Sequence, residues 1–218
     1  MKKTTTTTKS MLKFATIVAA LALVAGARRA NAMSENWSAY FENTFLTLKD
    51  QSTPLPQGDY IAIGIDTNNA GLSLSNPAGI SGIAESLDIW ATSTVGQGAG
   101  VEGAFSVTSS SAGTGFFGDQ IYLLAVNTSS PGTASQVGVF TNPAWVFPAS
   151  DTASANSLDI GDAGTTAVIG SFGTGTINDS NLGGTVNAAA LAQVPEPSSI
   201  ALVGLGLLGA IGLIRRRK

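Results

Sequence analysis

The chain has 218 residues and contains no histidine and no cysteine. Ser-His-Asp and Cys-His catalysis, disulfides, and zinc sites with His or Cys ligands are therefore excluded. All 14 acidic residues lie between Glu35 and Glu196, a stretch whose single cation is Lys49, so its formal charge is −13. Such an acidic stretch repels nucleic acids, and no nucleic-acid partner is expected.

The first 32 residues have the regions of a secretory signal peptide. Four lysines in the first 13 residues form a basic region, and residues 14–26 form an apolar stretch that is too short for an ordinary membrane span. Ala30 and Ala32 place small residues at the two positions that signal peptidase reads. We therefore expect cleavage between Ala32 and Met33, with residues 25–27 as an alternative site.

Residues 33–172 predict a β-rich passenger domain. Gly, Ser, Thr, Ala and Asn are abundant in it and Lys, Arg and Glu are scarce, a mixture that favours short strands over long helices. One helix is nevertheless expected over Ser34–Leu48, because Trp37, Phe41 and Phe45 recur every four residues. These residues are aromatic rather than strong helix formers, so a strand or a loop is the alternative.

Several segments are alternating or wholly apolar and predict strands. Tyr60–Asp66 alternates cleanly, and we expect a turn after it and a return strand that starts at Leu72 and Leu74. Residues 121–126 are apolar on both faces, which predicts the central strand of the core, with a hairpin partner at residues 136–141. Further short strands are expected at residues 87–92, 101–108, 144–147 and 167–172.

Short strands with turn signals between them predict an all-β fold class, with an antiparallel β-sandwich or a jelly-roll-like domain. Residues 150–164 are expected to form a polar surface loop. Residues 173–193, which are rich in Gly, Asn, Thr and Ala, are expected to form a flexible linker. A signal-peptide helix before the domain and a transmembrane helix after it complete the predicted organisation.

The expected surface loop contains candidates for a metal site. Asp151, Asp159 and Asp162 could converge on a calcium ion through their carboxylate oxygens. The simpler interpretation, which we favour, is that these aspartates form turns with their own backbone. No cofactor is then expected.

Two other patterns bear on sugar chemistry. Trp90 and Trp145 could stack on sugar rings, as in a carbohydrate-binding module, although their apolar surroundings favour packing in the core. Glu85 and Glu102 could serve as the carboxylate pair of a glycan hydrolase, although surface charge is the simpler interpretation. We therefore assign no catalytic residue and expect that the protein is not an enzyme.

The last 25 residues fall into three parts. Pro195 and Pro197 fix the backbone and remove amide donors, so the segment around Glu196 resists entering a helix or a sheet. Residues 198–214 carry no charge and would span about 25 Å as a helix, which is slightly less than the roughly 30 Å hydrocarbon core of a bilayer. The chain then carries four cations that favour the cytoplasmic side: Arg215, Arg216, Arg217 and Lys218.

Pro-Glu-Pro, an apolar stretch and a basic cluster, in this order, resemble the PEP-CTERM sorting signal, here over residues 194–218. The resemblance implies that an exosortase, an integral-membrane cysteine transpeptidase, recognises Pro195, Glu196 and Pro197 and cuts near them. It also implies that residues 198–214 are a transient inner-membrane anchor and that the four cations are the stop. A plain C-terminal anchor that is never cut is the alternative.

The same resemblance implies delivery to the cell surface or the extracellular matrix, with exopolysaccharide as a candidate partner. We expect an exported protein with a non-enzymatic, structural or adhesive role. A secreted carbohydrate-binding module is the alternative, and a glycan hydrolase is less favoured.

Overall fold

The computed structural model describes residues 32–40, 43–67, 72–74, 79–151, 153–177 and 184–194. All of them belong to one compact unit, Ala32–Lys218. The expected signal-peptide helix, Ala30, the Pro195–Pro197 motif, the apolar stretch and the basic cluster lie outside the described residues. Within the described ranges, no helix has the length and the apolar character needed to cross a membrane.

The described residues form mainly β-strands and one α-helix, which confirms the expectation of a β-rich domain. Strands β3, β4 and β6 lie at predicted segments, and β5 begins four residues later than expected. The two strands predicted at residues 136–141 and 144–147 are the single strand β7, and the strand predicted at residues 167–172 is divided between β9 and β10. In chain order the elements are β1 (Met33–Ala39), β2 (Thr44–Thr47), β3 (Tyr60–Asp66), α2 (Gly79–Glu85), β4 (Leu87–Thr94), β5 (Phe105–Ser111), β6 (Gln120–Val126), the 3-10 helix η2 (Pro131–Thr133), β7 (Gln136–Val146), β8 (Asn156–Asp159), β9 (Thr166–Ile169), β10 (Ser171–Ile177), β11 (Gly184–Ala190) and β12 (Ala192–Gln193).

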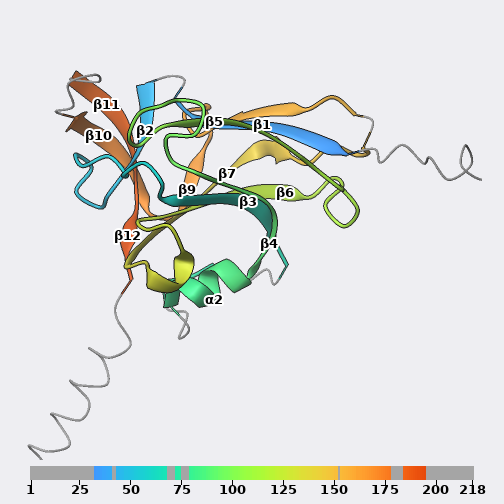
Figure 1. Ribbon diagram of the computed structural model, residues 1–218, viewed down its shortest axis with the longest axis horizontal. Coiled ribbons are helices and arrows are strands. Elements are labelled where there is room, and N and C mark those ends of the chain that lie inside the picture. The colour runs from blue at the N-terminus through green and yellow to red at the C-terminus, as the bar shows by residue number, and fades with distance from the viewer. Residues whose placement is uncertain are drawn as a thin grey trace, which may run out of the picture. The chain divides into compact units, whose positions relative to one another are not determined.

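The central sheet has the strand order β12-β7-β6-β3-β4, and β9 pairs with β7 on the same edge as β12 (Figure 1). Its neighbouring strands run antiparallel. Strand β6 lies in the middle, as predicted for residues 121–126, because both of its faces are apolar. Ile121 and Leu123 belong to one core cluster, and Leu124 and Val126 belong to another.

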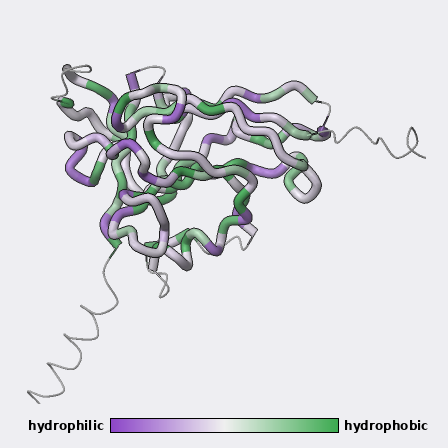
Figure 2. The backbone as a smooth tube through the Cα atoms, viewed as in Figure 1, coloured by the Kyte–Doolittle hydropathy of each residue, from purple (hydrophilic) through white to green (hydrophobic). Residues whose placement is uncertain are grey.

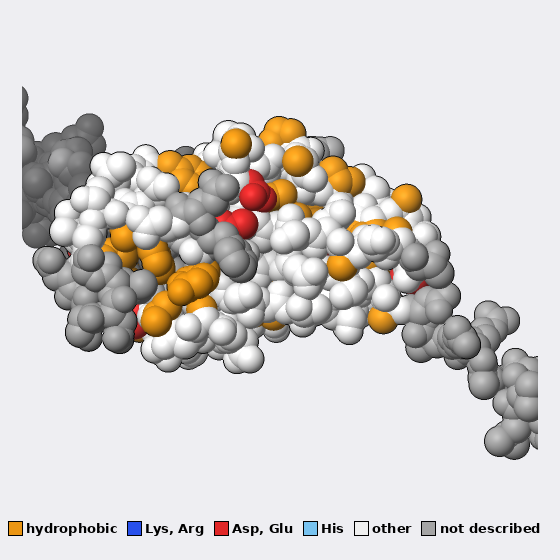
Figure 3. Space-filling model, turned by 90° about the horizontal axis from the view of Figure 1, so that it is seen from above, with side chains coloured by type: hydrophobic (Ala, Val, Ile, Leu, Met, Phe, Trp, Pro, Cys, Tyr) orange, Lys and Arg blue, Asp and Glu red, His pale blue; other side chains and the backbone are white. Residues whose placement is uncertain are grey.

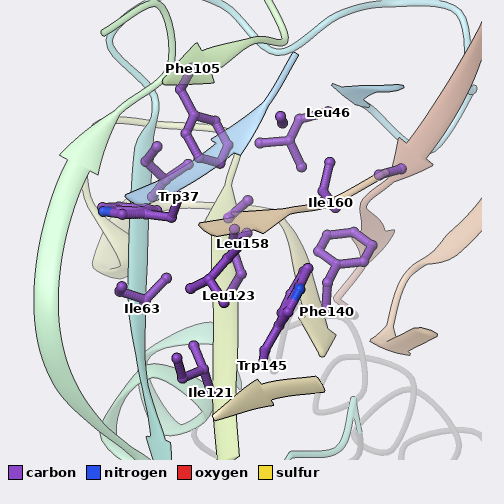
Figure 4. Close-up of a cluster of buried hydrophobic side chains, with 14 of the residues drawn as sticks. Trp37, Leu46, Ile63, Phe105, Ile121, Leu123, Phe140, Trp145, Leu158 and Ile160 are labelled. Carbon is purple, nitrogen blue, oxygen red and sulfur yellow. The ribbon is translucent and has the colours of Figure 1, made fainter. Parts of the chain in front are cut away.

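A second sheet, β5-β1-β8, covers one face of the central sheet. The main core lies between the two sheets, and Figure 4 shows Trp37 of β1 and Leu158 of β8 beside Leu123 and Phe140 of the central sheet. The rings of Trp37 and Phe105 meet edge to face with their centroids 5.4 Å apart. Two sheets therefore face each other across one core, and their six and three strands differ from the paired four-stranded sheets of a jelly roll.

Helix α2 packs on the other face of the central sheet, where Ile80 and Ile83 join the cluster that contains Leu124 (Figure 1). Figure 2 shows hydrophobic residues along the central strands that both layers cover. The expected return strand at Leu72 and Leu74 is wrong, because residues 72–74 lie in no strand and β4 is the antiparallel partner of β3. The helix precedes β4 because the second apolar face of the sheet needs a cover.

Strands β10 and β11 form a hairpin, and β11 also pairs in parallel with β2. The flexible linker expected at residues 173–193 is therefore wrong for the described residues in that range. Its small residues serve close packing: Ala188, Ala189 and Ala190 are fully buried. A Cβ on Gly175 would collide with the carbonyl oxygen of Gln51. Composition alone does not separate glycine used for close approach from glycine used for flexibility.

The helix expected over Ser34–Leu48 is also wrong, because β1 and β2 occupy this segment. A spacing of four residues returns to the same face in a strand as well as in a helix. In β1 the inward positions are Met33, Glu35, Trp37 and Ala39, all at most 1% exposed. Alternation with period two therefore decides the structure, and the aromatic residues suit a strand.

The polar surface loop expected at residues 150–164 contains strand β8, which pairs in parallel with β1. Leu158 is 3% exposed in the main core, and the side chains around it are Asn, Ser and Asp. The sequence signal for this strand is one apolar residue in a polar run. Its formation therefore depends on the backbone partners that β1 supplies.

Candidate functional site

The end of the described chain is part of the fold. Leu191 is 2% exposed in the main core and donates its backbone N–H to the carbonyl oxygen of Thr47 over 3.0 Å. The next two residues form β12 and pair with β7. Val194 is 7% exposed in the cluster that α2 covers, and it donates its backbone N–H to the carbonyl oxygen of Ser135 over 3.0 Å.

Two properties of proline bear on the residue that follows Val194. Pro195 has no amide hydrogen. A residue that precedes proline is restricted to extended backbone, which fits the hydrogen bond that Val194 makes directly after β12. The first residue of Pro-Glu-Pro therefore follows directly on the last hydrogen-bonded residue of the domain.

A folded β domain followed by Pro-Glu-Pro, an uncharged stretch and a basic cluster defines a class, namely passengers that carry a C-terminal sorting signal. Comparison with protein-family models identifies residues 193–218 as a PEP-CTERM protein-sorting motif. The chain therefore carries this motif, as the sequence predicted. No curated protein and no solved structure matches the chain at a significant level.

The motif indicates an exported protein that exosortase processes as its sorting partner, by way of a membrane-anchored intermediate on the route to the surface. Pro195, Glu196 and Pro197 and the cations Arg215–Lys218 all lie within the matched range. The structure adds what precedes them, which is a strand and a buried valine in place of the expected linker.

The expected signal-peptidase site lies at the other end of the domain. Ala32 is exposed, and Met33 is the first residue of β1, 1% exposed and paired with Ser111 of β5. Cleavage between Ala32 and Met33 stays a prediction. A mature chain that begins at Met33 would keep every residue of β1.

The three candidate calcium ligands do not share a site in the structure. Asp151 accepts the backbone N–H of Gly113 (3.1 Å). Asp159 accepts the Ser38 hydroxyl (2.5 Å) and the backbone N–H of Gly161 (2.8 Å). Among the described residues no group of three or more His, Cys, Asp or Glu side chains is arranged to hold a metal ion.

Asp162 also belongs to this loop, and its Oδ2 accepts the indole N–H of Trp145 (3.1 Å) and the backbone N–H of Asp159 (3.0 Å). Asp159 and Asp162 thus form turns within the loop and also hold it against β1 and β7, whereas Asp151 bonds a distant backbone rather than its own.

Trp90 and Trp145 are core residues, 7% and 2% exposed. The ring of Trp90 lies 5.4 Å from that of Phe147, and both tryptophans belong to the main cluster. They offer no exposed platform to a sugar ring. The structure instead leaves Phe172 of β10 39% exposed, and its ring makes a T-shaped contact with that of Phe140, with the centroids 5.4 Å apart.

Phe172 borders a cleft of about 220 Å³ between sheet β10-β11-β2 and the loop after β8. Asp162 and Thr165 contribute from the loop, and Asn187 and Thr44 lie opposite each other on β11 and β2. Sequence reasoning missed this cleft because β2 was expected in a helix, and most of β10 and all of β11 were expected in a linker. The aromatic residue in the run Ser-Phe-Gly-Thr-Gly-Thr is the signal that marks it in the sequence.

Glu85 and Glu102 are both exposed, as the surface-charge interpretation predicted. The structure places two other acids, Asp66 and Asp119, around a cleft of about 300 Å³ that Ile65, Gln120 and Tyr122 also line. Asp66 is the last residue of β3 and Asp119 directly precedes β6. Because these two strands pair antiparallel, both acids lie at the same end of the sheet.

Two carboxyls that the sequence did not mark are buried. Glu35 is fully buried in β1; its Oε2 accepts the backbone N–H of Asn156 (3.2 Å), and its Oε1 has no hydrogen-bond partner among the described residues. Burial raises the pKa of Glu35 from 4.5 to about 7, and the Asn156 hydrogen bond offsets part of this effect. Burial also raises the pKa of Asp59 from 3.8 to about 6.

Figure 3 shows one face of the described unit, with a small group of acidic side chains and dispersed hydrophobic ones and no Lys or Arg. Lys49 is the single cation in the part of the chain that the structure describes. The surface therefore favours neutral or cationic partners over polyanions.

Proposed function

We propose that this chain is an exported protein with a non-enzymatic, structural or adhesive role at the cell surface or in the extracellular matrix. The sorting motif at residues 193–218, whose first two residues are the last ones of a compact β domain, carries the proposal. The strong net negative charge favours solubility during transport. A domain without cysteine also folds independently of the redox state of the compartment.

The test is expression of the full chain in a host that has the exosortase, beside a variant in which Pro195, Glu196 and Pro197 are replaced by alanine. The wild type should lose its tail and reach the surface, whereas the variant should keep its full mass and stay in the membrane fraction. Intact-mass spectrometry and cell fractionation measure both outcomes. Equal mass and equal location of the two chains would refute the proposed sorting.

The position of the buried carboxyls supports a non-enzymatic role. A glycosidase needs a carboxylic acid that its surroundings keep protonated, next to a carboxylate, in a cleft that sugar enters. Burial raises the pKa of Glu35 and Asp59, and neither residue lines the cleft that Asp66 and Asp119 border. Both lie inside the domain, at most 7% exposed, where a glycan has no access.

Binding of a neutral glycan is a second candidate function, which the Phe172 cleft favours. Its volume of about 220 Å³ is smaller than the roughly 300–1,000 Å³ of sites for drug-sized ligands, so it suits a single sugar unit. Carbohydrate-binding sites are usually lined by an aromatic ring with hydroxyl, amide and carboxylate groups beside it. Acidic sugars would be repelled by Asp162 and by the net charge of the domain.

A glycan array with the mature protein and its Phe172→Ala variant tests this second function. Binding to neutral glycans that the substitution weakens tenfold or more would support it. The matched control is Phe117→Ala, because Phe117 is exposed to a similar degree, 37% against 39%, and does not line this cleft. Binding that both substitutions reduce equally, or no binding by the wild type, would count against it.

A further inference from the structure

The fold and the Pro-Glu-Pro motif adjoin without a linker. A flexible linker before the motif would increase the distance between the folded domain and the bond that the enzyme cuts. Here the matched range begins at residue 193, Val194 is buried and hydrogen-bonded, and Pro-Glu-Pro follows it at once. Three extended residues span about 10 Å, so any cut within Pro-Glu-Pro falls within about 10 Å of the folded domain.

Residues 191–194 are fixed to the domain from both faces and from one edge. Leu191 enters the main core, and Val194 enters the cluster that Ile80 and Ile83 of α2 share. Between them, Ala192 and Gln193 pair with β7, and the side chain of Gln193 donates to the carbonyl oxygen of Ser135 (3.1 Å). A protease that cut before Val194 would first have to detach this strand and expose both buried side chains.

We propose that exosortase cuts on the C-terminal side of Val194, and that β12 together with Val194 is the part of the fold that sets this limit. This inference rests on the proposed sorting function. When the peptide bond breaks, the carbonyl carbon on the domain side passes to water or to an amine acceptor, and the nitrogen of the departing tail takes up a proton as a free amine. The released passenger keeps the complete β12 edge.

Val194 acts here as a positioning residue. Its side chain lies in the cluster under α2 and its backbone N–H is bonded to Ser135, and these two contacts restrict which bonds reach the enzyme. Substituting Val194→Asp places a charge in the apolar cluster under α2 and should loosen β12. Bonds upstream of residue 194 then become accessible.

The experiment uses the full chain in a host that has the exosortase and identifies the mature C-terminus by mass spectrometry of the C-terminal peptide. The wild type should give termini at residue 194 or beyond. The Val194→Asp variant should give additional termini at or before residue 193, at least ten times more abundant than in the wild type. A third chain with six Gly and Ser residues inserted between Val194 and Pro195 should give additional termini within the insert, because the folded domain no longer shields the bonds before Pro195. Termini only at the wild-type distance from the motif would show that the motif alone sets the bond and would overturn the proposal.

The matched control is Val168→Asp. Val168 lies on β9, which pairs with the same edge of β7 as β12, but it is 42% exposed. This variant should give the wild-type termini. General damage to the fold would alter both variants alike, and the thermal unfolding midpoints of the released products show whether such damage occurs.

The outcomes separate this inference from the sorting function. A wild-type chain that is cut before Val194 overturns the limit set by β12 and leaves sorting intact. A wild-type chain that keeps its full mass overturns sorting and, with it, this inference. Identical termini in the wild type and in Val194→Asp would show that the enzyme alone chooses the bond, and would also overturn the proposal.

Discussion

Glu35 shows how a single residue can couple the stability of this domain to pH. It occupies an inward position of β1, which alternation reserves for apolar side chains such as Trp37. Only one of its two oxygens has a hydrogen-bond partner among the described residues. A charged carboxylate in this place is therefore costly, and the pKa of Glu35 rises to about 7.

The sign of the resulting pH dependence follows from linkage. The folded state binds the Glu35 proton more tightly than the unfolded state, because the pKa falls from about 7 to 4.5 on unfolding. The free energy of unfolding therefore decreases as pH rises from about 4.5 to 7. Asp59, with its pKa raised to about 6, acts in the same direction between about 4 and 6.

We predict that Glu35→Gln stabilises the mature domain at pH 8 by about 1–3 kcal/mol, because a neutral amide of the same shape replaces a buried charge. At pH 4 the variant and the wild type should unfold at nearly the same temperature. Thermal melts at the two pH values measure the difference. A gain at pH 4 as large as that at pH 8 would show that charge is not the cause.

At the scale of elements, the corner between β9 and β10 joins two sheets. The chain pairs with β7 up to Ile169 and with β11 from Ser171 onward, so Gly170 is where it changes partners. Its φ is +107°, and a Cβ there would lie 2.4 Å from the carbonyl oxygen of Ala190. Only glycine meets both conditions without strain.

We predict that Gly170→Ala destabilises the domain by about 1–3 kcal/mol, since the backbone must leave a conformation that alanine disfavours and must also clear Ala190. This corresponds to a fall in the unfolding midpoint of roughly 2–12 °C for a domain of this size. Gly132→Ala is the control, because its nearest neighbour is 3.9 Å away and its φ is not positive. If both substitutions lower the unfolding midpoint by the same small amount, the corner at residue 170 does not require glycine.

At the scale of the whole molecule, the domain extends to residue 194, well beyond the boundary that composition suggested. The segment after residue 172 supplies most of β10, all of β11 and β12, and buried side chains to each of the core clusters. These include Val186, Leu191 and Val194, one in each cluster.

We predict that a mature chain ending at residue 172 fails to fold, whereas one ending at residue 194 folds. Each buried Val or Leu contributes roughly 1.5–3 kcal/mol, and a domain is stable by only about 5–15 kcal/mol in total. Soluble yield and thermal melts of the two chains measure this. A cooperative transition in the shorter chain, within a few degrees of the longer one, would restore the linker interpretation.

The candidate functional site was predictable where covalent chemistry or composition alone decides the outcome. The prolines at 195 and 197, the uncharged stretch and the terminal cations identify the sorting motif without a fold, because each acts through its own residue type. The central strand at residues 121–126 was equally clear, since a segment that is apolar on both faces must be covered on both.

Local sequence patterns failed to predict the structure wherever pairing between distant segments determines it. The aromatic spacing at residues 37–45 fits a helix and a strand equally well, and only pairing with β5 and β8 selects the strand. The acids Asp66 and Asp119 lie 53 positions apart in the sequence and share a cleft because β3 and β6 pair.

The sequence by itself identified the sorting motif, because proline, uncharged residues and cations act there through their own residue types. The tertiary structure decided where the passenger ends. Glycine and alanine in residues 173–193 are ambiguous in isolation, and they form strands because β2, β7 and β11 offer partners at distances that only small side chains permit.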